Sequence, residues 1–139
     1  MEDRPILICY DGSTGARHAI DAAARLLGAR QAVVLDVGPM QASGSEVAAL
    51  DETVSELTSG RAKAGATRAR NAGFHANGRA DIDGPAWCGA VEVADEIGAA
   101  AIVVGSRGLC GVKALLESSF SRLVAIHADR PVLVVPPPN

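Results

Sequence analysis

Short runs of apolar, β-branched residues alternate along this chain with segments of helical periodicity, and this alternation constrains the fold more than any other feature. It is typical of βαβ units, in which helices join parallel strands and cover the sheet that they form. The sequence therefore predicts an α/β fold with a parallel sheet. The expected strands are Ile6–Tyr10, Ala32–Val37, Phe74–Ala80, Ala100–Val104 and Val132–Val135.

Turn and capping residues indicate where the intervening helices begin and end. Apolar residues from Ala16 to Leu27 share one helix face, and Gly28 follows them as a stop. The spacing of Ser43 and Glu46 is that of a capping box, which predicts a long helix to about Ala72, although its pattern contains two glycines. Two more helices are expected, one between Gly84-Pro85 and Gly98 and one with Phe120, Leu123, Val124 and His127 on one face.

Length and charge limit the classes of protein to consider. A chain of 139 residues, 48% of them hydrophobic, fits one domain over residues 1–139 with a substantial core. A net charge of −3 without a Lys/Arg cluster argues against a nucleic acid or an anionic membrane as the main partner. The charged start lacks the apolar region of a signal peptide, and no apolar run has the length of a membrane span, so we expect a cytoplasmic protein.

The three cysteines Cys9, Cys88 and Cys110 are widely spaced and form no C-x-x-C pair. This spacing indicates neither a disulfide framework nor a zinc site. We expect buried free thiols, with Cys110, in a glycine-rich loop, as the one exception expected to be exposed.

That loop, Gly105–Ser121, lies between an apolar strand and a helix. Outward-facing N–H groups and a helix dipole favour an anionic ligand such as phosphate at such a place. The loop has neither the Gly-Lys-Ser/Thr of a Walker A motif nor the G-x-G-x-x-G dinucleotide fingerprint. Nucleotide binding is therefore the first hypothesis, although the loop alone is a weak signal.

Several motifs in order resemble the universal stress protein family over nearly the whole chain. Gly105-Ser-Arg-Gly108 is followed after nine residues by Ser118-Ser119, where the family pattern has Gly-[Ser/Thr]. The chain thus departs from the pattern at Ser118. Supporting matches are Asp11-Gly-Ser after the first strand, Gly84-Pro-Ala86 before a helix, and the ending His127-Ala-Asp-Arg-Pro131-Val-Leu-Val-Val135.

The resemblance implies a three-layer αβα fold with a doubly wound five-stranded parallel sheet, of the adenine nucleotide alpha hydrolase-like or Rossmann-like kind. It also implies ATP or AMP at the carboxyl ends of the strands, where open α/β sheets bind ligands. Mg²⁺ or Mn²⁺ would accompany the nucleotide, held by phosphate oxygens and water. The nucleotide-binding residues that it implies are Tyr10 through its backbone, Asp11, Val37, Gly105, Arg107, Gly108, Ser118, Ser119, Phe120 and Ser121.

Each of these residues also has a purely structural interpretation. Asp11 can be a turn or N-cap residue, and the serines can cap the last helix. Ser118 can either block a phosphate or donate a hydrogen bond to it. Arg107 and Lys113 can offset phosphate charge or simply be solvated. For His127 we favour packing over metal binding, and for Trp87 a partly buried anchor over an interface.

Three classes of function follow. The favoured one is a nucleotide-binding regulator that forms a homodimer through the edge strand Val132–Val135. The second is an interaction module of the same fold that binds no nucleotide because of Ser118. An enzyme is the least favoured, since no adenylylation motif and no paired carboxylates accompany the phosphate loop, although slow incidental ATP hydrolysis is compatible with the first class. A phospho-receiver domain is set aside because Asp11 stands alone after the first strand.

Overall fold

The structure is a computed structural model of the chain, and it describes residues 4–38, 47–80, 84–106 and 120–136, with only the backbone of residues 47–59. In this part of the chain, strands and helices alternate as the sequence predicts. The elements are β1 (Ile6–Tyr10), α1 (Thr14–Leu27), β2 (Gln31–Asp36), α2 (Val47–Ala72), β3 (His75–Arg79), α3 (Ala86–Ile97), β4 (Ile102–Gly105), α5 (Phe120–His127) and β5 (Val132–Val135). Their bounds differ from the expected ones by one or two residues at most strand ends.

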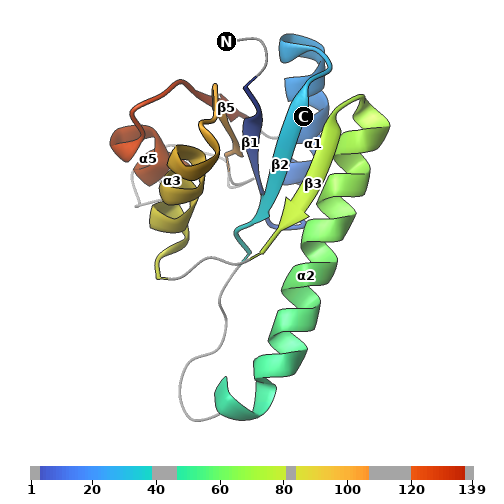
Figure 1. The fold of residues 1–139 in the computed structure, drawn as a ribbon, viewed down its shortest axis with the longest axis vertical. Helices are drawn as coiled ribbons and strands as arrows, with labels where there is room; N and C mark the ends of the chain where they lie inside the picture. The colour runs from blue at the N-terminus through green and yellow to red at the C-terminus, as the bar shows by residue number, and fades with distance from the viewer. Residues whose placement is uncertain (1–3, 39–46, 81–83, 107–119, 137–139) are drawn as a thin grey trace.

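All strand pairs are parallel, and the 5-stranded sheet has the order β3-β2-β1-β4-β5. Helices α1 and α2 cover one face of this sheet, whereas α3 and α5 cover the other (Figure 1). The predicted three-layer, doubly wound α/β fold is therefore confirmed. In this topology the chain leaves β1 in one direction toward β2 and later returns on its other side to β4, so the carboxyl ends of β1 and β4 flank a switch point.

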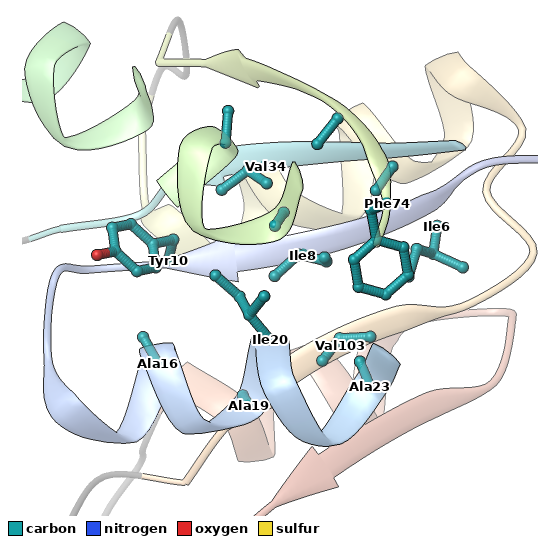
Figure 2. Packing of buried hydrophobic residues seen from close by; sticks show 14 of the residues in the cluster. Ile6, Ile8, Tyr10, Ala16, Ala19, Ile20, Ala23, Val34, Phe74 and Val103 are labelled. Atoms are coloured by element: carbon teal, nitrogen blue, oxygen red, sulfur yellow. The ribbon is translucent and has the colours of Figure 1, made fainter. Parts of the chain in front are cut away.

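The central strand β1 is buried along its whole length because both faces of the sheet are covered. Ile6, Ile8 and Tyr10 point toward α1 and α2, where they meet Ile20 and a set of helix alanines (Figure 2). Leu7 and Cys9 point to the opposite face, toward α3 and α5. The alanines of the helices are small side chains, which let the helices lie close to the sheet.

Helix α2 runs through both glycines that interrupt its sequence pattern. At Gly65 the reason is steric: a Cβ there would lie 2.7 Å from Tyr10 Cδ2 and 2.8 Å from Val34 Cγ1. The helix backbone approaches the sheet so closely at this point that only glycine fits without a rearrangement. At Gly60 a Cβ would meet nothing within 4 Å, so no contact of this kind explains that glycine.

Candidate functional site

A pocket lies at the carboxyl ends of β1, β2 and β4, where the switch point of the sheet predicts a ligand site. The first residues of α1 and α5 close it. Five of the residues predicted from the sequence lie in its wall: Asp11, Val37, Gly105, Phe120 and Ser121. Segments as far apart in the chain as Asp11 and Ser121 thus converge where the resemblance places a nucleotide. Arg107, Gly108, Ser118 and Ser119 lie outside the described residues, as do Cys110 and Lys113.

Tyr10 does not line the pocket, although Cys9 and Asp11 on either side of it do. Its side chain is buried on the opposite side of β1, beneath α2, and its carbonyl accepts a hydrogen bond of 2.8 Å from the Val37 N–H. The Tyr10 carbonyl is therefore engaged in joining β1 to β2. Within the described residues, no hydrogen bond engages the Val37 carbonyl, so this is the group of the Val37 backbone left for a ligand.

Asp11 has the turn role that its sequence neighbourhood suggests. Its Oδ1 accepts a hydrogen bond of 3.0 Å from the Ser13 N–H, and Gly12 between them has φ +82°, which favours glycine. Ser13 in turn caps α1, because its Oγ accepts from the Ala16 N–H at 3.1 Å. Within the described residues, the second carboxylate oxygen of Asp11 has no hydrogen-bond partner. The turn role therefore leaves one acceptor for a ligand hydroxyl.

Gly105 lies close to the backbone of α1. A Cβ at this position would lie 3.0 Å from the carbonyl oxygen of Gly15, in the first turn of α1. The following residue, Ser106, continues the sheet by donating its N–H to the Val135 carbonyl at 2.8 Å. The end of β4 is thus held between α1 and β5, and Gly105 allows that close approach in addition to any approach of a ligand.

Helix α5 begins at the pocket with Phe120 and Ser121. The dipole of a helix places partial positive charge at its N-terminal end. Ser121 is buried, and Phe120 is partly exposed. This end of the pocket is therefore suited to an anion, while Asp11 and Val37 offer acceptors at the other segments.

The sequence reasoning missed several residues of the site. Ser13 and Ser106 line the pocket directly beside predicted residues, and Cys9 lines it because it lies two residues before Asp11. It also missed Asp36, whose buried carboxylate contacts Gly38 N at 2.7 Å and Arg61 Nε at 3.2 Å. The available signal was a single acidic residue within an apolar strand, since a buried charge requires a partner.

The cysteines need one correction. Cys9 is buried, and burial raises the pKa of its thiol far above the usual range, which disfavours the reactive thiolate. Cys88, which was expected to be buried, is partly exposed on α3, and its Sγ lies 3.6 Å from Glu92 Oε1. The sequence did not reveal this exposure because Cys88 is directly followed by residues of the buried face of α3. That face is formed by Gly89, Ala90, Val93 and Ala94.

Trp87 and His127 join the two helices on the α3 side of the sheet. Their rings stack with centroids 4.3 Å apart, and His127 Nδ1 lies 2.9 Å from the Leu123 carbonyl oxygen. Both residues therefore have the packing role favoured from the sequence. Within the described part of the chain, no group of His, Cys, Asp and Glu is arranged to bind a metal, and none of the described helices combines the length and the apolar character that spanning a bilayer requires.

Comparison with known proteins connects this pocket to a family. The universal stress protein family model matches residues 3–136. Among curated proteins, no sequence matches at a significant level.

Several solved structures have the same fold. A universal stress protein in complex with cAMP is 23% identical, with a TM-score of 0.68 over 99% of this chain and 100% of that one. The universal stress protein from Archaeoglobus fulgidus in complex with dAMP is 22% identical, with a TM-score of 0.65 over 97% and 99% of the two chains. An Arabidopsis thaliana family protein with AMP bound is 13% identical, with a TM-score of 0.71 over 97% and 92%. At these identities the likeness establishes the fold.

Proposed function

The chain belongs to the universal stress protein family, and we propose on this basis that it binds ATP or AMP in the pocket described above and acts as a homodimeric regulator of a stress response. The observation that carries the proposal is the convergence of Asp11, Val37 and the start of α5 in one pocket. Family members with this fold have been solved with cAMP, dAMP and AMP, which supports an adenine nucleotide as the ligand class.

The chemistry of the pocket suits each part of such a ligand. The free oxygen of Asp11 can accept from a ribose hydroxyl, and the Val37 carbonyl can accept from the amino group of adenine. The start of α5, with Ser121, would face the phosphates. Arg107, Gly108, Ser118 and Ser119 are proposed to complete the phosphate site on sequence grounds.

A metal ion would be held through the nucleotide. Because the described residues contain no cluster of metal ligands, Mg²⁺ or Mn²⁺ would be coordinated by phosphate oxygens and water, as is usual for nucleotide-bound magnesium. Nucleotide occupancy would then act by stabilising one state of the protein, with at most slow incidental hydrolysis. We propose the cytoplasm as its location.

Ser106 provides a direct test of the site. We expect wild-type protein to bind ATP in a calorimetric titration and Ser106→Glu to abolish the binding, because a carboxylate in the pocket repels phosphate. Ser106→Gln is the matched control, since it adds nearly the same volume without the charge, and it should keep more of the affinity than Ser106→Glu. Equal ATP affinity in wild-type protein and Ser106→Glu would show that the phosphates do not bind in this pocket.

The second candidate function is an interaction module that binds no nucleotide, and the serine at position 118 favours it. Mass spectrometry of small molecules released from freshly denatured protein distinguishes the two. Adenine nucleotide in amounts close to one per chain supports the regulator, whereas its absence, together with no binding of added ATP, supports the interaction module.

The dimer is proposed to form through β5. This strand is an edge of the sheet, and Val134 is 43% exposed although it is apolar. An uncovered edge strand invites pairing with another strand. A second copy of β5, antiparallel across a two-fold axis, would pair its free backbone groups and cover the valine.

A further inference from the structure

Arg61, on α2, contacts the turns that follow β1 and β2. A Cβ on Gly12 would lie 3.5 Å from Arg61 Cδ, and a Cβ on Gly38 would lie 2.5 Å from Arg61 Cζ. The guanidinium therefore rests directly on the backbone of Gly38, where no larger residue fits without displacing it. Gly12 and Gly38 are the residues that follow Asp11 and Val37, the two acceptor residues of the pocket.

The Arg61 guanidinium also pairs with Asp36. The Asp36 side chain is 1% exposed, and Arg61 Nε donates to its Oδ2 at 3.2 Å. The other oxygen, Oδ1, accepts from the Gly38 N–H at 2.7 Å. A buried carboxylate with both oxygens engaged is held in one position, and removing its charged partner is costly.

This position determines where the Val37 carbonyl points. The Val37 C=O and the Gly38 N–H belong to one planar trans peptide group, so they point in opposite directions. With the Gly38 N–H held by Asp36, the Val37 carbonyl faces away from that carboxylate. The Val37 N–H is fixed as well, by the Tyr10 carbonyl. Arg61, Asp36 and Gly38 thus form a chain of contacts that ends on the acceptor proposed for the adenine amino group.

Helix α2 is firmly seated where it carries Arg61. Ala62 is buried, and a Cβ on Gly78 of β3 would lie 2.7 Å from the Ala62 carbonyl oxygen. One turn further, Gly65 lies against Tyr10 and Val34. The helix backbone is therefore in close contact with the sheet over the turn that begins at Arg61, and this packing supports the contacts described above.

We propose that Arg61 is a positioning residue for base selectivity. Through Asp36 it orients the Val37–Gly38 peptide group, so that the Val37 carbonyl accepts a hydrogen bond from the amino group of adenine. The same carbonyl repels the carbonyl oxygen that guanine carries in place of that amino group. The inference rests on the proposed function, because it concerns the nucleotide in that pocket. It adds a residue that does not line the pocket and acts through another side chain.

The test compares ATP and GTP by calorimetric titration in wild-type protein and in three variants. Arg61→Met keeps the aliphatic stem and removes the guanidinium, and Arg61→Lys restores a positive charge. Arg68→Met is the matched control, since Arg68 is on the same helix and pairs with Asp21 at 2.7 Å away from the pocket. The quantity compared is the ratio of the GTP and ATP dissociation constants.

We expect wild-type protein to bind ATP more tightly than GTP. In Arg61→Met the ratio of the two dissociation constants should fall about tenfold, and in Arg61→Lys it should fall less. Arg68→Met should keep the wild-type ratio. If Arg61→Met does not fold, Asp36→Leu combined with Arg61→Met replaces it, because no buried charge is then left unpaired and no side chain at position 36 accepts from the Gly38 N–H. An unchanged ratio in the Arg61 variants, or equal loss of both nucleotides, overturns the inference while leaving nucleotide binding intact. Wild-type protein that binds neither nucleotide overturns the proposed function together with the inference.

Discussion

Cys88 illustrates how one neighbouring residue controls the chemistry of a side chain. Partial burial and the Glu92 carboxylate, one helical turn away, both raise the pKa of the Cys88 thiol. Glu92→Gln removes the negative charge and the carboxylate acceptor, so this pKa should fall and the thiolate fraction at pH 8 should rise. We expect Cys88 in Glu92→Gln to react with iodoacetamide about two to five times faster than in wild-type protein.

The reaction is followed by mass spectrometry of peptides, which assigns the label to each cysteine. Cys9 serves as an internal control: it is 3% exposed and should remain unlabelled in both proteins until they are denatured. An equal labelling rate of Cys88 in the two proteins would show that the contact with Glu92 does not persist in solution.

At the scale of a single element, α2 contains two glycines with opposite expected effects on stability. Glycine inside a helix normally costs about 0.5–1 kcal/mol relative to alanine. Gly60→Ala should therefore raise the free energy of unfolding by about that amount, since its Cβ meets no other atom within 4 Å. Gly65→Ala should lower it by about 1–3 kcal/mol, because the added methyl group overlaps Tyr10 and Val34.

Urea denaturation followed by circular dichroism measures both changes, and the slope of the transition checks that the unfolded state is unchanged. The pair controls for helix propensity, because both substitutions are the same and lie in the same helix. A stabilising effect of Gly65→Ala equal to that of Gly60→Ala would mean that α2 does not approach the sheet closely at this point.

At the scale of the whole molecule, we propose that the edge strand β5 forms the dimer interface. Ile102 and Ser106 donate hydrogen bonds to the carbonyls of Pro131 and Val135, at 2.9 and 2.8 Å. Backbone groups alternate in direction along a strand, so those of Val134 point toward the open edge. Val134→Pro removes the outward N–H without removing a bond to β4, a position where an edge strand tolerates proline. We expect wild-type protein to scatter light as a dimer, close to twice 14.2 kDa, and Val134→Pro to be a folded monomer.

Val134→Thr is the matched control, since it keeps the N–H and the branched shape of the side chain and should remain dimeric. Circular dichroism confirms that both variants fold. A wild-type monomer at micromolar concentration would contradict the proposed dimer, and a dimeric Val134→Pro would place the interface on another surface.

Local pattern was sufficient to predict the elements of this protein. Each described strand and helix was predicted close to its observed position, because periodicity, capping residues and glycine stops act over a few residues and are visible in any window of the chain. The alternation also predicted a parallel sheet, and the family resemblance supplied its doubly wound arrangement. Since parallel strands end at the same edge, the position of a ligand site could also be expected, and the family resemblance supplied the five predicted residues that lie in the pocket wall.

The remaining features depended on how distant segments dock. The Asp36–Arg61 pair joins residues 25 positions apart, and nothing near either residue in the sequence indicates the other. Gly65 looked like a break in a helix, and Gly105 like a feature of a ligand loop, until the contacts with Tyr10 and Gly15 were known. Spacing along the chain carries the information for turns and for helix or strand faces, whereas close packing between elements depends on distances that arise only when the helices settle on the sheet.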